Sequence, residues 1–122
     1  MRVPDFVLRQ FYVAGSLAND ADGFHLQARN GLGDGTIVGI GRIAVDGMSV
    51  APEAVSARRG GDETVYRAAD ISRRSPVAFR RGDVVTFHVA GRPLAPGEHA
   101  FEVEIHELDL GTLMIAIRDT VG

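Results

Sequence analysis

The stretch HAFEVEIHEL, from His99 to Leu108, decides the fold class because its polarity alternates residue by residue. The apolar side holds Phe101, Val103 and Ile105, and the polar side holds Glu102, Glu104 and His106. A repeat of two is typical of a half-buried β-strand, whereas a helix would repeat its apolar residues every three or four positions. The stretch therefore predicts a strand with one face against a core.

The same period recurs along the chain, with turn residues between the periodic segments. The segments are GFHLQARN (23–30), VVTFHVAG (84–91) and TLMIAIRD (112–119). Asp22-Gly23 and Asp46-Gly47 are suited to two-residue type I′ hairpin turns. Glu63–Ser72 is the one helix candidate, but it is short and lacks an apolar stripe, so we expect it to be extended. We predict a single all-β domain over residues 1–122, an antiparallel β-sandwich of jelly-roll or Ig-like type with seven to nine strands.

The last two periodic segments should form a hairpin with a defined register. Aligning the apolar faces places Ile105 opposite Ile115. The loop would then be Asp109–Gly111, with Gly111 in the left-handed conformation. The same register places Glu102 opposite Arg118.

The glycine-rich stretch GLGDGTIVGIG, Gly31 to Gly41, raises the question of a phosphate-binding loop. Such loops lead into a helix whose free N–H groups bind the phosphate, and no helix pattern follows Gly41. We therefore expect Thr36–Ile40 to be a strand covered on both faces, with glycines at β-bulges or close approaches.

Composition narrows the function classes. The chain has 122 residues, no cysteine and a formal net charge of −3. This charge disfavours nucleic acid as a partner. No segment has the length and apolarity of a signal peptide or a membrane span, so we expect a cytoplasmic protein without membrane contact.

The histidines are the only serious candidate residues for a metal site or an acid–base site. His88 and His106 are placed on polar faces, and neighbouring strands could join them with a glutamate as zinc-compatible ligands. The alternative, two solvated or interface histidines, is the more common situation. We therefore assign no catalytic and no metal-binding residue to this chain.

The N-terminal stretch and the glycine-rich strand are apolar on both sides. Packing one face of a strand against the core buries only every second side chain. The apolar side chains on the other face must then be covered by something else. We expect these segments to contact a partner. The predicted interface residues are Phe6, Val7, Leu8, Phe11, Tyr12, Ile37, Val38 and Ile40.

Six segments in order resemble the small β subunit of bacterial C-glycoside deglycosidases. They are VPDFVLRQFYVAGSL (3–17), NGLGDGTIVGIGRIAVDG (30–47), AADIS (68–72), SPVAFRRGD (75–83), LAPGEHAFEVEI (94–105) and GTLMIAIRDTV (111–121). The resemblance implies a non-catalytic β-sandwich subunit that stabilises a TIM-barrel α subunit and walls its active site. That α subunit would hold the divalent metal, usually manganese, and this chain none.

In that family the hetero-oligomer is a carbon–carbon lyase, which cleaves the bond between a 3-keto sugar and an aromatic aglycone. A free-standing sugar-binding β-sandwich module is the alternative. It is disfavoured by the absence of tryptophan and by the small number of tyrosines. A small stand-alone enzyme of jelly-roll type is a third possibility, and no His/His/Glu spacing on paired strands supports it.

Overall fold

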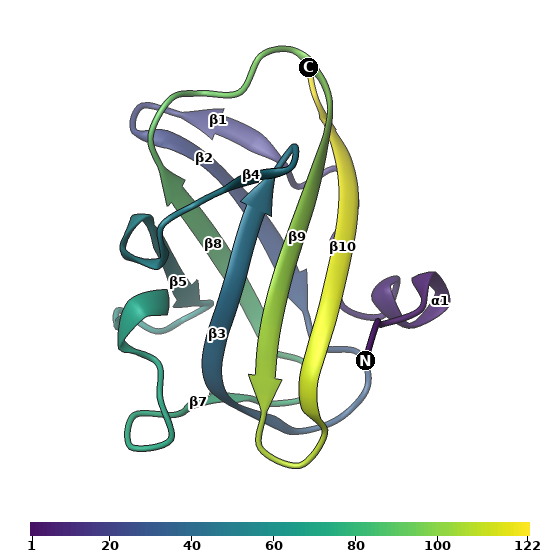
Figure 1. The fold of residues 1–122 in the computed structure, drawn as a ribbon, viewed down its shortest axis with the longest axis vertical. Coiled ribbons are helices and arrows are strands. Elements are labelled where there is room, and N and C mark those ends of the chain that lie inside the picture. The colour runs from purple at the N-terminus through teal and green to yellow at the C-terminus, as the bar shows by residue number, and fades with distance from the viewer.

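The computed structural model describes all 122 residues and consists of two antiparallel sheets packed face to face (Figure 1). The first sheet has the order β1-β2-β8-β5-β6. Its strands are β1 (Ala18–Asp20), β2 (Gly23–Arg29), β8 (Val84–Ala90), β5 (Val55–Arg59) and β6 (Val65–Arg67). The second has the order β10-β9-β3-β4, and β7 also pairs with β3. Its strands are β10 (Gly111–Val121), β9 (Gly97–Glu107), β3 (Gly35–Val45), β4 (Met48–Ser49) and β7 (Val77–Phe79).

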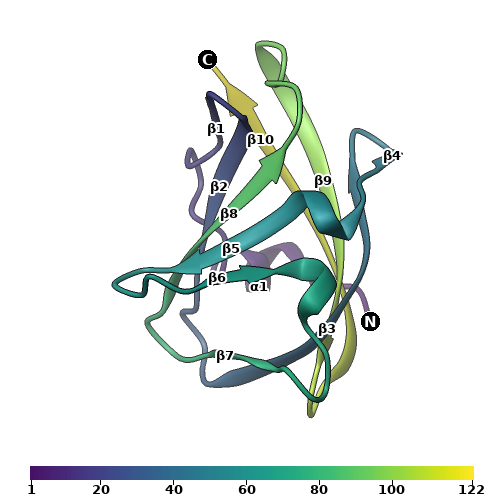
Figure 2. The ribbon, with the colours of Figure 1, turned by 90° about the vertical axis from the view of Figure 1, so that its left-hand side faces the viewer.

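The predicted antiparallel β-sandwich is confirmed, with ten strands instead of seven to nine. The additional strands are short pairings at the sheet edges, such as β4 and β7, which no periodicity can reveal. Figure 2 shows the two sheets from the side, with β5 and β6 in the nearer layer.

Two facing aromatic side chains mark the centre of the core. Phe24 of β2 and Phe101 of β9 come from opposite sheets, with ring centroids 5.7 Å apart. Around them pack buried residues that alternate along the strands, as the period of two predicted. The buried cluster is Leu17, Phe24, Leu26, Ile43, Val55, Ala68, Val89, Phe101 and Val121.

In the β9–β10 hairpin the predicted side chains share a face, but the predicted register is wrong. Ile105 pairs with Leu113 instead of Ile115, and Val103 pairs with Ile115. Because side chains alternate with a period of two, a shift of two residues leaves every side chain on its face. Apolar alignment alone therefore cannot distinguish these registers.

The hairpin loop explains which register is adopted. Glu107 pairs with Gly111, so the loop is Leu108–Leu110. The buried Glu107 carboxylate accepts the backbone N–H of Asp109 at 2.9 and 3.1 Å, which closes the loop one residue earlier than predicted. Gly111 has the predicted positive φ, +80°.

The register changes the expected ion pair on the outer face. Glu102 lies opposite Ala116 instead of Arg118. The Arg118 guanidinium contacts Glu98 at 3.0 Å, and Glu102 lies 3.7 Å from Arg42. The predicted Glu102–Arg118 pair is therefore wrong.

The two predicted aspartate–glycine turns differ in outcome. Asp46-Gly47 is a two-residue loop with φ of +51° and +81°, as a type I′ turn requires. At the other site Asp20 pairs with Gly23, so the loop is Ala21-Asp22 and the predicted Asp22-Gly23 turn is wrong by one residue.

The glycine-rich stretch forms most of β3, and its pairing with β9 is interrupted. Register shifts occur between Ile37 and Gly39 and between Ile40 and Ile43. The glycines of this strand therefore accompany irregular pairing, as expected.

The two segments of uncertain conformation are short mixed elements. The N-terminal stretch contains a four-residue helix, α1 (Asp5–Leu8), so it is not a strand. The predicted extended segment 63–72 contains β6 followed by the 3-10 helix η2 (Ala68–Asp70). A second 3-10 helix, η1, spans Pro52–Ala54. No helix of the chain is both long and apolar enough to cross a membrane.

Candidate functional site

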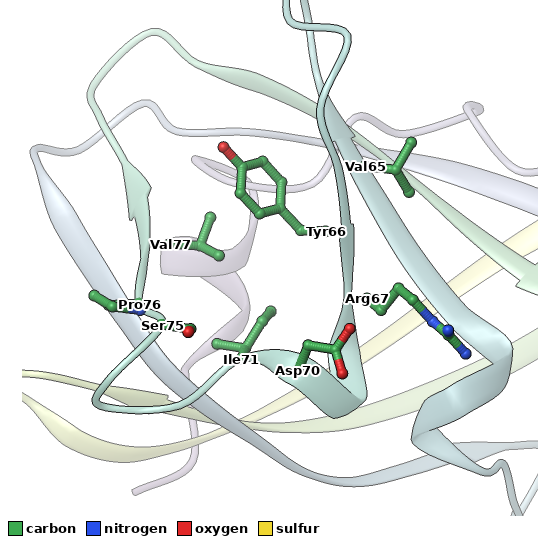
Figure 3. A pocket seen from close by; sticks show the side chains of 8 residues that line it. All are labelled: Val65, Tyr66, Arg67, Asp70, Ile71, Ser75, Pro76 and Val77. Carbon is green, nitrogen blue, oxygen red and sulfur yellow. The ribbon is translucent and has the colours of Figure 1, made fainter.

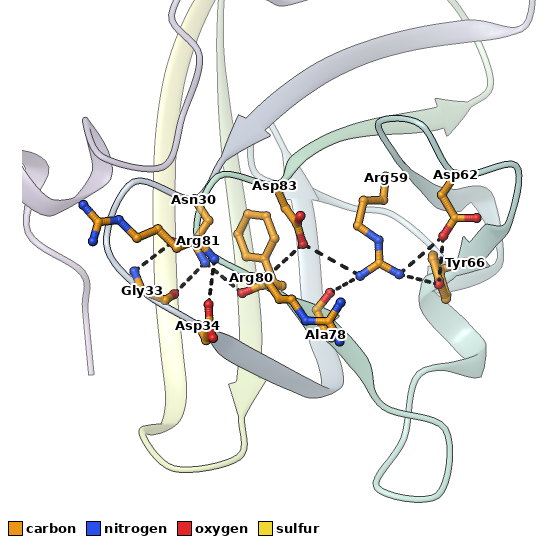
Figure 4. Close-up of polar contacts among 11 residues, drawn as sticks. Asn30, Gly33, Asp34, Arg59, Asp62, Tyr66, Ala78, Arg80, Arg81 and Asp83 are labelled. Carbon is orange, nitrogen blue, oxygen red and sulfur yellow. Dashed lines mark hydrogen bonds and ion pairs between the residues drawn. The ribbon is translucent and has the colours of Figure 1, made fainter.

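Asn30, which directly follows β2, joins the loops at one end of the sandwich. It is only 1% exposed. Its amide nitrogen donates to the carbonyl oxygens of Gly33 and Phe79, at 2.7 and 2.8 Å. Its amide oxygen accepts the backbone N–H groups of Leu32 and Gly33. The side chain thereby fixes the β2–β3 loop against the end of β7 (Figure 4).

The backbone of Asn30 extends this connection to the β7–β8 turn. Its N–H donates to the carbonyl oxygen of Asp83 at 3.0 Å, and its own carbonyl accepts the N–H of Gly82 at 2.8 Å. Because every polar group of this buried residue has a partner, the loops around it are held in one arrangement.

Arg59, at the end of β5, forms a second polar cluster beside the first (Figure 4). Its guanidinium donates to the Ala78 carbonyl at 2.7 Å and to the Tyr66 hydroxyl at 2.8 Å. It also lies 3.4 Å from Asp62 and 3.8 Å from Asp83. This arginine links the first sheet to β7, so its contacts are structural.

A small cavity lies between β6 and the segment leading to β7 (Figure 3). Its volume is about 190 Å³. Tyr66, Ile71 and Val77 line it together with the polar side chains of Arg67 and Asp70. Pockets for organic ligands usually measure about 300 to 1,000 Å³, so this cavity is small for a substrate.

A larger cavity, of about 450 Å³, lies where the turn after α1 meets the end of β2 and the β7–β8 turn. We call it the arginine cavity, because Arg9, Arg29 and Arg81 line it. The other lining residues are Gln10, Phe11, Tyr12, Val13, Asn30, Gly31 and Gly82. Its volume is sufficient for a small organic molecule.

Neither the role of Asn30 nor the arginine cavity was predicted from the sequence. The only local signal for Asn30 is an Asn-Gly step after a strand, which is a common turn signature. Its key partners Phe79 and Asp83 lie about fifty residues away, and the three arginines come from separate segments. No local pattern reveals such a meeting of distant segments.

The predicted interface residues are not equivalent in the structure. Phe6 is 69% exposed, whereas Leu8 and Val38 are each 8% exposed and are covered by this chain itself. Phe11 stacks on Phe79 with ring centroids 6.4 Å apart, and Ile40 packs against the core cluster. Val7 and Ile37 are half-buried.

Tyr12, the remaining predicted interface residue, is engaged within the chain. Its hydroxyl donates to Asp119 at 2.6 Å, and its ring packs against the core cluster. Among the eight residues, Phe6 is therefore the only one with a mostly exposed side chain. The interface itself stays a prediction.

The two histidines considered as joint zinc ligands lie in different sheets, His88 on β8 and His106 on β9. That suggested ligand set is not assembled. His88 instead lies opposite His25, and Asp20 contacts both rings, at 3.2 and 3.1 Å. The hydrogen bond with His25, followed by smaller contributions that include His88, lowers the pKa of Asp20.

No group of three or more His, Asp or Glu side chains in the structure is arranged to hold a metal ion. The contacts of His25 and His88 with Asp20 are direct, so the three side chains satisfy one another. Whether the chain binds a metal in solution stays a prediction.

Comparison with known families overturns the resemblance to C-glycoside deglycosidase β subunits. The family model of the hydroxymethylglutaryl-CoA reductase N-terminal domain matches residues 7–122. No curated protein matches the chain. The function predicted from the resemblance, a deglycosidase subunit in a carbon–carbon lyase, is therefore wrong, and the match does not name a sugar-binding module either.

The physical reason for the error lies in the segments that carried the resemblance. They consist of alternating apolar residues and glycine, proline or aspartate turns, which any antiparallel sandwich needs. Their order reflects a β-sandwich more than a particular activity. Because the family model covers nearly the whole sequence, the chain belongs to the family of the hydroxymethylglutaryl-CoA reductase N-terminal domain.

Proposed function

We propose that this chain is an accessory β-sandwich domain that associates with a catalytic reductase polypeptide and carries no catalytic residue itself. The observation that carries the proposal is a group of exposed apolar side chains at one end of the sandwich. Exposed apolar residues that gather in one region usually mark protein contacts.

Five of the seven large apolar residues that are exposed lie on or beside this apolar end. Those on it are Met1 (70% exposed), Leu32 (51%), Leu108 (48%) and Leu110 (65%). The fifth, Phe6 (69%), lies on α1, which sits beside β10 at mid-height of the sandwich. The β9–β10 loop and the β2–β3 connection lie at the same end in Figure 1, and the N-terminus runs beside β10.

Backbone hydrogen bonds support this placement. The Met1 amino group donates to the carbonyl oxygen of Thr112, next to the β9–β10 loop. The N–H of Leu108 donates to the carbonyl oxygen of Thr36, at the start of β3. The N-terminus, the hairpin loop and the start of β3 are thus held together.

The side chains that could take part in catalysis support an accessory role, because they form hydrogen bonds and ion pairs with one another. Tyr12 binds Asp119, His99 binds Asp46, and Arg59 binds Asp62 and Tyr66. Groups that hold loops and strands in place are poorly suited to change partners during a reaction. In this proposal the catalytic residues and any metal belong to the partner polypeptide.

The partner in this proposal is the catalytic part of a hydroxymethylglutaryl-CoA reductase, because the family is named for a domain of that enzyme. The proposal includes a hetero-oligomeric state and a cytoplasmic location. Nucleic acid and membrane lipid are not partners in it, in keeping with the net charge of −3.

Co-expression of this chain with the reductase catalytic polypeptide from the same organism tests the proposal. We expect the two to co-elute in size-exclusion chromatography. The double variant Phe6→Asp, Leu110→Asp should lower the amount of this chain that elutes with the reductase polypeptide by at least about tenfold. The reason is that burying an unpaired carboxylate within an apolar contact is costly.

Met48→Asp is the matched control. Met48 is 75% exposed but lies at the β3–β4 turn, away from the apolar end. Circular dichroism of each variant reports whether it is folded. Equal co-elution of wild type and the double variant, with both folded, would place the contact elsewhere, and failure of the wild-type pair to associate would reject the proposed partner.

A further inference from the structure

The arginine cavity contains three cationic side chains that no carboxylate neutralises. All ion pairs of arginine within 4.0 Å of an acidic group involve Arg42, Arg59 or Arg118. Arg9, Arg29 and Arg81 form none, although the chain as a whole has a net charge of −3. A local excess of positive charge around a hollow attracts anions.

The positions of the three arginines are determined by separate parts of the fold. Arg9 follows α1, Arg29 ends β2, and Arg81 lies in the β7–β8 turn. In Figure 4 the side chain of Arg81 extends away from the Arg59 cluster. The three arginines come from separate segments, so they surround one cavity only when the chain is folded.

Backbone hydrogen bonds hold these segments together. The N–H of Arg29 donates to the carbonyl of Phe11 at 2.5 Å, and the N–H of Gly31 donates to that of Gln10 at 2.8 Å. On the opposite side the N–H of Gly82 donates to the Asn30 carbonyl at 2.8 Å. The backbone around the cavity is therefore held in one arrangement before any ligand enters, which reduces that part of the entropic cost of binding.

The two acidic residues near Arg81 make their contacts elsewhere. Asp34 accepts the backbone N–H of Arg81 at 3.0 Å. Asp83 accepts the backbone N–H of Arg80 at 2.8 Å and contacts Arg59. Neither carboxylate is paired with the Arg81 guanidinium.

From this geometry we propose that the arginine cavity binds a small organic molecule through its phosphate groups. The guanidinium of arginine presents paired N–H donors that match phosphate oxygens in bidentate fashion. Three such groups suit a diphosphate or two nearby phosphates better than a single carboxylate. The remaining volume, with Phe11 and Tyr12 in its lining, accommodates the organic part.

This site is independent of the proposed association. It does not use Phe6 or Leu110, and its ligand need not be a substrate of the partner. A chain that fails to bind a reductase polypeptide can therefore still bind phosphate, and the two proposals are tested separately.

Isothermal titration calorimetry with pyrophosphate as the probe tests the inference on the full chain. We expect saturable binding of one pyrophosphate per chain with a dissociation constant below about 1 mM. Inorganic phosphate should bind at least about fivefold more weakly, because it engages fewer guanidinium groups. Citrate distinguishes carboxylate from phosphate, and it should bind at least about fivefold more weakly than pyrophosphate.

Substitutions identify the residues responsible. Arg29→Gln and Arg81→Gln should each weaken pyrophosphate binding by about tenfold, and Arg81→Lys should recover only part of the loss, since lysine lacks the paired donors. Arg92→Gln is the matched control. It removes the same charge from an exposed arginine in the β8–β9 loop, outside the cavity, and it should change affinity less than about twofold.

Three outcomes would overturn the inference while circular dichroism confirms folded protein. Absence of saturable binding up to about 10 mM pyrophosphate would reject the site. Equal losses of pyrophosphate affinity in Arg92→Gln and Arg81→Gln would indicate only a general effect of net charge. Citrate binding as tight as pyrophosphate binding would assign the cavity to carboxylates.

Discussion

The Tyr12 hydroxyl donates a 2.6 Å hydrogen bond to Oδ2 of Asp119, a residue 107 positions later in the chain. The same oxygen accepts the backbone N–H of Gly15 at 3.0 Å. Burial acts to raise the pKa of Asp119, but the hydrogen bonds from Tyr12 and from backbone N–H groups outweigh it and lower that pKa. Burial, and then the contact with Asp119, raise the pKa of Tyr12. A neutral phenol and an ionised carboxylate thus fasten the N-terminal segment to the last strand.

Replacing Tyr12 with Phe should lower the free energy of unfolding by about 1 to 2 kcal/mol, because a hydrogen bond to a charged group is lost while the ring is kept. Urea denaturation at neutral pH measures this change. Asp119→Asn in wild type and in Tyr12→Phe completes a double-mutant cycle. A coupling energy near zero would mean that the hydrogen bond does not stabilise the fold.

His99 should make stability depend on pH. Its Nδ1 lies 2.6 Å from the Asp46 carboxylate, and its Nε2 lies 2.7 Å from the Ala95 carbonyl oxygen. Both partners only accept hydrogen bonds, so the doubly protonated ring satisfies both. The contact with Asp46, followed by the one with Ala95, raises the pKa of His99. This stabilisation is therefore complete below the unfolded pKa of about 6.5 and is lost as pH rises through the folded pKa.

The measurement compares wild type with His99→Gln by urea denaturation from about pH 5.5 to about pH 9. The stability difference should shrink as pH rises across this range. A second window lies in acid, because the hydrogen bond with His99 lowers the pKa of Asp46. That contribution is present above the ordinary pKa of aspartate and is lost as pH falls through the folded value. A difference that stays constant across the upper window would contradict the assigned role of His99.

The period of two correctly predicted which side chains of β2, β8, β9 and β10 face the core, because burial acts on each residue locally. Asp46-Gly47 was predictable for a similar reason, since both residues tolerate the positive φ of a type I′ turn. The register of the last hairpin was not predictable. Two registers that differ by two residues bury the same face, so the alternation cannot choose between them, and the adopted one is accompanied by the Glu107 contact with the loop.

The candidate sites were harder to predict from the sequence than the fold. They depend on contacts between residues that lie far apart in the chain. Asn30 is polar and follows a strand, so its sequence context predicts an exposed turn. Its burial results from Phe79 and Asp83, which reach it only once β7 and β8 are in place. In the same way Arg9, Arg29 and Arg81 have no common sequence pattern.

Asn30→Asp should destabilise the chain by about 3 kcal/mol or more at neutral pH, because an ionised carboxylate cannot donate to the Gly33 and Phe79 carbonyl oxygens. Thermal and urea denaturation measure the loss. Lower pH should recover part of it, since a protonated carboxyl donates one hydrogen bond. Asn19→Asp is the control. Asn19 is exposed and makes an analogous contact with Leu94, so its cost should stay below about 1 kcal/mol. Similar losses for both variants would show that the Asn30 contacts carry little weight.

Gly23→Ala should be among the most destabilising single-methyl additions in the chain. Gly23 is buried at the start of β2 and has φ of +151°, which alanine rarely adopts. A Cβ atom there would lie 2.0 Å from the carbonyl oxygen of Val89, a backbone atom of the neighbouring strand. Because a backbone atom cannot rotate away as a side chain can, β2 and β8 would have to separate locally. We expect a loss of about 3 kcal/mol or more in the free energy of unfolding.

Gly33→Ala provides the matched control for this substitution. Gly33 lies just before β3, no atom lies within 4 Å of the position that its Cβ would occupy, and its φ is not in the left-handed region. Its replacement should change stability by less than about 1 kcal/mol. Urea denaturation compares the two variants, and amide hydrogen exchange at β2 and β8 locates the effect. Faster exchange confined to these strands in Gly23→Ala is expected. Equal stability of the two variants would show that Val89 and Gly23 do not approach as closely as the fold requires.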